Sequence, residues 1–291
     1  MPVEFLSDEQ VAAYGRFAGP PSRAQLERFF FLNDADRQRI DRRRPGPRRD
    51  SHRLGFAVQL GTVRFLGAFL PDPLAVPRAV VAYVAGQLGI AEPGCLAAYP
   101  ERAMTPYEHA WEIRRAYGYR DFAAGEPALR AFLAARAWTS TEGPLALFDR
   151  ATAWLLEQKV LLPGATTLAK LVAAVRAEAA ERLWGRIDRA LEAAAGHDAA
   201  LRGRLHDLLA AEDGGRRSRL ERLRTPPRRL SGPALVRALA RVTEVRALGA
   251  GAVDLADLPA NRLAAVARYG LLAKAPSCAS WPSPGGRPRC W

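Results

Sequence analysis

The chain has 291 residues, 49% of them hydrophobic and 25% charged, which excludes a disordered chain and allows one large or two ordinary globular domains. No apolar run approaches the roughly 18 residues of a membrane span, MPVEFLSDEQ is too polar for a signal peptide, and three cysteines without metal-ligand spacing favour a reducing cytosolic compartment. The 43 basic residues exceed the 30 acidic ones, and this net charge of +13 favours a polyanionic partner, although G/C-rich coding also favours arginine.

Helix-start signals open the chain. Ser7 and Gln10 have the spacing of a capping box, in which the side chain and backbone of the first turn bond reciprocally. Ser22 and Gln25 repeat that spacing, and the Asn-Asp pair at 33–34 caps a third helix that ends in a basic turn. The positions that we expect the first two helices to bury are Val11, Tyr14, Phe17, Leu26, Phe29 and Phe30.

The stretch 52–73, HRLGFAVQLGTVRFLGAFLPDP, predicts a helix over about 52–70 that ends at its Pro-Asp-Pro. Leu54, Val58, Phe65 and Phe69 recur at roughly helical spacing, so they form an apolar face. We expect the polar residues Gln59, Thr62 and Arg64 to face elsewhere. A basic loop that leads into such a helix is suited to seating the helix on DNA. The arginines of this loop and of the helix start are Arg42, Arg43, Arg44, Arg48, Arg49 and Arg53.

The middle of the chain continues with helical signals. A helix begins after Pro77 and ends at Gly89, residues 91–100 form a connector, and Thr105 with Pro106 at the first helical position opens the next helix. That helix carries Arg114 and Arg115 and is followed by Arg120, with tyrosines between them. This pattern suits phosphate contact, but a solvated helix face explains it equally well.

Helices follow at about 127–138 and 145–159, and Thr166 or Thr167 caps a long helix from Leu168 to about Ala195. Two helices around a turn can set a helix start against a duplex, but the same pattern fits an ordinary antiparallel pair. Residues 212–232 are rich in Gly, Pro and Arg, and helices resume at 233–248 and 259–270. The chain is therefore predicted to be an all-α, multi-helix protein with little or no sheet.

Several segments together, in a consistent order, resemble the N-terminal, DUF4158-type region of Tn3-family transposases. They cover about 275 residues of the chain. The segments are EFLSDEQVAAYGRFAGPPSRAQLERFFFLNDADR (4–37), RLGFAVQLGTVRFLGAFLPDP (53–73), VVAYVAGQLGI (80–90), EIRRAYGYRDF (112–122), ARAWTS (135–140), ATAWLLEQKVLLPGATTLAKLV (151–172), SGPALVRAL (231–239) and ARYGLLAKA (267–275).

The resemblance implies helix-turn-helix-like subdomains that bind the terminal inverted repeats of a transposon as double-stranded DNA, in a bacterial cytoplasm at the nucleoid. We expect a first DNA-binding subdomain at 1–73, a second at 74–211, a basic linker at 212–232 and the start of a further helical domain at 233–276. The tail at 277–291 loses helical character, which suggests a disordered, frameshifted end and a transposase truncated before its catalytic domain.

No enzymatic motif is recognisable in the chain, so we expect no catalytic residue and no small-molecule substrate. In the resembled family an acidic triad holds two Mg²⁺ ions in a part that this chain lacks, so no cofactor is expected here. The predicted DNA contacts are Arg42, Arg43, Arg44, Arg48, Arg49, Arg53, Arg64, Arg114, Arg115 and Arg120, with Gln59 and Thr62 as weaker candidates for base readout.

Two alternatives to DNA binding remain open. An α-helical interaction scaffold, including a homodimer, would suit the alanine-rich helix at 168–195. An inactive transposase remnant would follow if the tail is out of frame.

Overall fold

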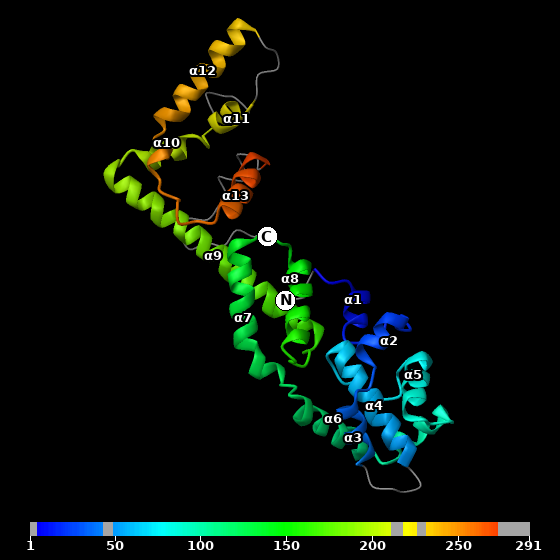
Figure 1. Cartoon of the computed structure of the whole chain (residues 1–291). Helices are drawn as coiled ribbons and strands as arrows, with labels where there is room; N and C mark the ends of the chain where they lie inside the picture. The colour runs from blue at the N-terminus through cyan, green and yellow to red at the C-terminus, as the bar shows by residue number, and fades with distance from the viewer. Residues whose placement is uncertain (1–4, 43–48, 211–217, 226–230, 273–291) are drawn as a thin grey trace. The chain divides into compact units, whose positions relative to one another are not determined.

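The computed structural model describes residues 5–42, 49–210, 218–225 and 231–272 (Figure 1). In these ranges every regular element is a helix and no strand forms, which confirms the all-α class. The chain divides into two compact units. Unit 1 comprises Met1–Ala134 and Glu142–Val175, and unit 2 comprises Ala135–Thr141 and Arg176–Trp291.

The helices of unit 1 are α1 (Asp8–Ala13), α2 (Arg23–Phe29), α3 (Asp34–Asp41), α4 (Arg49–Leu66), α5 (Arg78–Leu88), the 3-10 helix η1 (Pro93–Glu101), α6 (Met104–Tyr117), most of α7 (Phe122–Thr139), α8 (Pro144–Glu157) and the start of α9 (Ala165–His197). Unit 2 contains the remainder of α7 and α9, followed by α10 (Leu201–Asp207), α11 (Arg219–Arg224), α12 (Gly232–Ala247), η2 (Ala250–Ala252) and α13 (Ala260–Leu272).

Local capping signals fix the first helix starts. Complete capping boxes occur at Ser7, Ser22 and Asn33, which confirms the three predicted starts. In each, the N-cap side chain accepts a hydrogen bond from the third helical N–H, which would otherwise lack an intrahelical partner. Burial followed the predictions less closely. Phe30 is fully buried, but Val11 is 40% exposed, so the prediction that α1 buries Val11 is wrong.

Helix α4 lies at the centre of unit 1. It packs against α2, α3, α5, η1 and α6 (Figure 1), and most of its side chains are buried. The prediction that Gln59 and Thr62 face away from the core is therefore wrong, because they are only 8% and 2% exposed. The Gln59 side-chain amide instead donates to the Tyr99 hydroxyl at 3.0 Å and to the Pro106 carbonyl at 3.2 Å. Gln59 and Thr62 therefore do not form the exposed polar edge expected for this helix.

Two glycines allow aromatic rings to contact the backbone of α4. A Cβ atom at Gly55 would lie 2.3 Å from the Tyr99 ring, and one at Gly61 would lie 2.2 Å from the Phe30 ring. Real Cβ atoms do not approach ring carbons so closely, so any larger residue would displace these rings. The helix ends at Gly67, whose φ of 73° is left-handed, and not at the later prolines as predicted.

Two further segments differ from the sequence-based expectations, and one agrees. Helix α5 begins after Pro77 and ends at Gly89, as predicted. The expected connector at 91–100 is the 3-10 helix η1, which buries Leu96 and Tyr99. The predicted N-cap at Thr105 is also wrong, because α6 starts at Met104 with Ala103 at the N-cap, two residues earlier than predicted, and Thr105 is only 3% exposed.

One hydrophobic core extends across residue 73. It joins Phe30, Leu54 and Leu60 to Val80 and Ile113, all of them fully buried. The packing of unit 1 is therefore continuous across residue 73. The separate DNA-binding subdomains expected at 1–73 and 74–211 stay predictions.

Within the described ranges no single helix is long and apolar enough to cross a membrane. The pair α5 and η1, bent by 100°, meets that test only when joined, and several of its side chains lie in this core.

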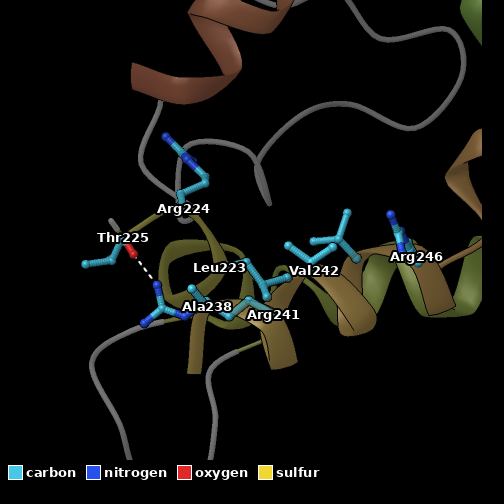
Figure 2. Close-up of a pocket in the computed structure, with 8 residues that line it drawn as sticks. Leu223, Arg224, Thr225, Ala238, Arg241, Val242 and Arg246 are labelled. Atoms are coloured by element: carbon cyan, nitrogen blue, oxygen red, sulfur yellow. Dashed lines mark hydrogen bonds between the residues drawn. The ribbon is translucent and has the colours of Figure 1, made fainter. Parts of the chain in front are cut away.

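Unit 2 contains fewer buried side chains and an exposed apolar helix. Trp138 lies under the Arg182 guanidinium at 4.4 Å. On α12, Leu235, Val236 and Leu239 are 63%, 66% and 59% exposed. Beside this face, α11 and α12 enclose a groove of about 460 Å³ (Figure 2). It is lined by Leu223, Arg224, Thr225, Ala238, Arg241, Val242, Val245 and Arg246.

Candidate nucleic-acid interface

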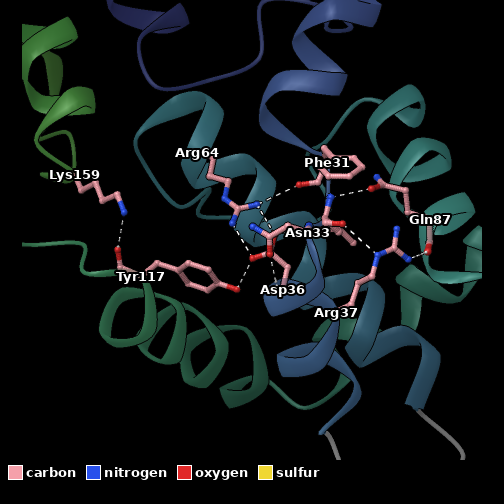
Figure 3. A network of polar contacts seen from close by, with 9 residues as sticks. Phe31, Asn33, Asp36, Arg37, Arg64, Gln87, Tyr117 and Lys159 are labelled. Atoms are coloured by element: carbon pink, nitrogen blue, oxygen red, sulfur yellow. Dashed lines mark hydrogen bonds and ion pairs between the residues drawn. The ribbon is translucent and has the colours of Figure 1, made fainter.

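Basic side chains from three parts of unit 1 contact Tyr117 at the end of α6, and three further arginines lie within three residues of it in the chain. The guanidinium of Arg64 lies 5.3 Å from the centre of the Tyr117 ring, and that of Arg39 lies at 5.9 Å. From the turn after α8, Lys159 Nζ donates to the Tyr117 carbonyl at 3.2 Å (Figure 3). We call the following residues the Tyr117 cluster: Arg39, Arg64, Arg114, Arg115, Arg120 and Lys159.

A buried carboxylate anchors the cluster. The side chain of Asp36 is 1% exposed and accepts two hydrogen bonds from Arg64, at 2.8 and 3.0 Å. The Tyr117 hydroxyl donates to it at 2.8 Å, and the Asn33 N–H does so at 3.1 Å (Figure 3). These contacts tie α3, α4 and α6 together, and they fix Arg64 in a bidentate geometry that a lysine cannot reproduce.

The pKa values of this pair follow from the same contacts. Burial alone would raise the pKa of Asp36, but the hydrogen bonds from Arg64 and Tyr117 and the charge of Arg64 hold it below its ordinary value. Burial, together with the hydrogen bond to Asp36 and its charge, raises the pKa of Tyr117. Asp36 is therefore ionised and Tyr117 is a neutral donor at physiological pH.

The α6–α7 junction is hydrogen-bonded to the α8–α9 junction. The Arg120 N–H donates to the Lys159 carbonyl at 2.9 Å, and the Leu161 N–H donates to the Arg120 carbonyl at 2.9 Å, around an isolated parallel β-bridge. The next residue, Leu162, donates to the carbonyl of Gly67 at 2.9 Å. These bonds hold the two basic turns in a fixed geometry next to the end of α4.

Lys159 has a strained backbone. Its φ of 50° makes it the one non-glycine residue with positive φ in the part of the chain that the structure describes. A left-handed lysine costs about 1–2 kcal/mol, so glycine would be the more stable choice. Backbone strain of this kind is concentrated at functional sites, which makes Lys159 a candidate for a functional role.

Three cations of the cluster pair with carboxylates, and the other three contact neutral groups. Arg39 pairs with Glu112 at 3.7 Å, Arg114 pairs with Asp121, and Arg64 pairs with Asp36. The other three cations contact neutral groups. Arg115 lies 4.5 Å from the Trp111 ring centre, Arg120 donates to the Gln158 carbonyl at 3.3 Å, and Lys159 donates to the Tyr117 carbonyl. All three are exposed, so a phosphate can approach them.

Of the residues predicted from sequence, Arg64 contacts the Tyr117 ring, and Arg114, Arg115 and Arg120 lie within three residues of Tyr117 in the chain. Sequence reasoning missed Arg39 and Lys159, and no local pattern marks them, because they approach Tyr117 from α3 and from the turn after α8. In the described ranges no three His, Cys, Asp or Glu side chains converge as a metal site.

The predicted basic loop is only partly described. Arg42 caps the end of α3 and is exposed. Arg53 is 15% exposed and pairs with Asp41 at 2.9 Å and with Asp50 at 3.1 Å, so part of its charge is neutralised. Arg43, Arg44 and Arg48 lie outside the described residues, as does the tail at 277–291, and of Arg49 only the backbone, at the start of α4, is described.

A known family model matches the part of the chain that contains unit 1. Residues 5–175 match the family model named Domain of unknown function (DUF4158). The match ends at Val175, the last residue of unit 1, and it includes every member of the Tyr117 cluster.

Curated relatives match nearly the whole chain. The transposase for transposon gamma-delta of Escherichia coli (strain K12) is 40% identical over 284 residues, which are 97% of this chain and 27% of that protein. The transposase for transposon Tn1546 of Enterococcus faecium is 26% identical over 269 residues, 92% of this chain and 26% of that protein. The chain therefore spans about a quarter of the length of these relatives.

Proposed function

We propose, from the premise that this chain belongs to the DUF4158 family and is related to Tn3-family transposases, that unit 1 binds double-stranded DNA at transposon terminal inverted repeats. The observation that carries the proposal is the Tyr117 cluster, which contains cations from separate elements, three of them exposed and in contact with neutral groups.

The chemistry of the cluster suits the phosphate backbone. Arginine and lysine neutralise phosphates and release condensed counterions, which supplies most of the affinity and sets the register of the protein on the duplex. Tyr117 orients Arg39 and Arg64 through its ring, so the cations are ordered before DNA arrives. Gln59 and Thr62 are buried, so we do not include them among the proposed base contacts.

The test is binding of the full chain to a duplex that carries the terminal repeat of its own element, compared with a scrambled duplex of equal length. Fluorescence anisotropy at 50 and 200 mM salt would report both affinities. If six to ten phosphates are engaged, affinity falls about 10³–10⁵-fold between these concentrations. Equal affinity for both duplexes, or no dependence on salt, would contradict the proposal.

A protein-interaction role is the second candidate, and the exposed apolar face of α12 favours it. Leu235, Val236 and Leu239 are each more than half exposed, and contiguous exposed apolar patches are typical of interaction sites. If α12 forms a homodimer interface, Leu239→Glu converts the dimer to a monomer by light scattering. An unchanged dimer or a monomeric parent chain would remove this candidate. Oligomerisation that is insensitive to salt, without DNA affinity, would favour it over DNA binding.

We also propose that this chain alone does not cut or join DNA, and that it acts at the bacterial nucleoid. The relatives are transposases about four times as long, so the chemistry of the whole protein is not assigned to this segment. Incubation of the chain with Mg²⁺ and a repeat-bearing duplex should give no cleaved or joined strands. A cleaved product would overturn this part of the proposal. A chain that binds but does not cleave could compete with an intact transposase for the transposon ends.

A further inference from the structure

The start of α9 has one buried face and one exposed face, both within unit 1. Leu168, Ala169, Leu171 and Val172 are buried and fix the rotation of the helix about its axis. The side chains on the opposite face are short, apart from one lysine. They are Thr166, Thr167, Lys170 and Ala173, and all four are exposed.

This face is free of negative charge. From Gln158 to Val175 the sequence contains no Asp or Glu, and its two charged residues are Lys159 and Lys170. Helix α3, which follows α2 after a short connection, is less suited to a duplex because its exposed face includes Asp34 and Asp41. Carboxylates facing phosphates would repel them, so charge complementarity favours α9.

The start of α9 also lies close to the Tyr117 cluster. The Leu161 N–H is bonded to the Arg120 carbonyl, and α9 begins only four residues later at Ala165. Four residues span at most about 14 Å, so Arg120, Lys159 and the helix start can contact one major groove and its flanking phosphates.

We propose that the exposed face of α9 at Thr166, Thr167, Lys170 and Ala173 enters the major groove and contacts base edges, while Arg120 and Lys159 hold adjacent phosphates. The inference rests on the proposed DNA binding and specifies where sequence is read. Threonine hydroxyls can donate to or accept from bases, Lys170 can donate to guanine O6 and N7, and the Ala173 methyl can contact a thymine methyl.

The test is selection of binding sites from a duplex pool with a random central segment, carried out with the full chain and with two variants. We expect Lys170→Ala, and the double variant Thr166→Ala/Thr167→Ala, to select a motif that differs from that of the parent at one or more positions. On the parent motif each variant should lose roughly 5- to 150-fold in affinity, while binding to scrambled DNA changes much less.

A pair of variants, each with one inserted carboxylate, tests whether a loss of sequence selection is caused by unfolding. Ala173→Glu places a carboxylate on the proposed face, and Ala82→Glu places one on the exposed side of α5. Both are exposed alanines within a helix, so both variants should keep their helix content by circular dichroism. Only Ala173→Glu should abolish selection.

The outcomes separate the two proposals. If all α9 variants select the parent motif with parent affinity, α9 does not contact the bases, although DNA binding by unit 1 stands. If the parent chain enriches no sequence at all, the proposed function fails and the inference fails with it.

Discussion

The carboxylate of Asp36 is nearly inaccessible to solvent and lies between donors from three residues, so its stability depends on the Arg64 charge. Arg64→Leu would leave the negative charge of Asp36 buried without the cation that neutralises it. Loss of one partner from a buried ion pair costs about 3–5 kcal/mol, and we expect this loss in the free energy of unfolding at neutral pH. Urea unfolding followed by circular dichroism measures it.

The effect should depend on pH with a defined sign. The pKa of Asp36 in the folded chain lies below the ordinary value of 3.8, so the pair stabilises the fold above that pH and stops doing so as the pH falls through the folded value. In the variant, burial without Arg64 raises this pKa, so protonation stabilises the variant. The difference between parent and variant should therefore shrink in acid. A constant difference across the range would show that Asp36 does not carry the effect.

Gly55 is needed for packing rather than for backbone conformation. A methyl group there would overlap the Tyr99 ring, so Gly55→Ala should destabilise unit 1 by about 1–3 kcal/mol although alanine favours helix. Gly86→Ala in α5 is the matched control, because no atom lies within 4 Å of its added Cβ. The control should be neutral or more stable in the same thermal melt. Equal effects of the two substitutions would refute the packing explanation.

At the scale of elements, the turn after α8 is strained because the charged residue Lys159 has a left-handed backbone conformation there. Lys159→Gly should remove about 1–2 kcal/mol of backbone strain, partly offset by the greater freedom of glycine in the unfolded chain. We therefore expect a melting temperature equal to or above that of the parent, together with weaker DNA binding.

Lys159→Asn is the companion variant, because asparagine tolerates the left-handed conformation and also lacks the charge. It should weaken DNA binding as Lys159→Gly does. Unchanged affinity in both variants would leave the strained lysine without a functional explanation.

Element boundaries were predicted well where the signal is local. The boxes at Ser7 and Ser22 and the cap at Asn33 use atoms within one turn, so sequence suffices to find them. The cap expected at Thr105 has the right residue types, but packing buries Thr105 and the helix begins earlier. Tertiary burial here overrides a local preference.

For the whole molecule, we expect the net charge of +13 to strengthen DNA binding only where exposed cations lie close together. The triple variant Arg115→Ala/Arg120→Ala/Lys159→Ala should reduce the slope of log affinity against log salt by about 2.7, since each phosphate contact contributes about 0.9. The control Arg16→Ala/Arg23→Ala/Arg78→Ala removes the same charge from exposed positions elsewhere in unit 1. We expect its slope to stay near that of the parent. Equal slopes for the two triples would mean that only total charge matters.

The sequence by itself determined the all-α class, most helix positions and the relationship to Tn3-family transposases, because capping, helical periodicity and residue order are local or linear properties. It also predicts DNA contacts at Arg64, Arg114, Arg115 and Arg120, and these stay predictions. Only the tertiary structure decided that Gln59 and Thr62 are buried, and that Arg39 and Lys159 join the others at Tyr117. These outcomes depend on contacts between residues far apart in the chain, which no local pattern encodes.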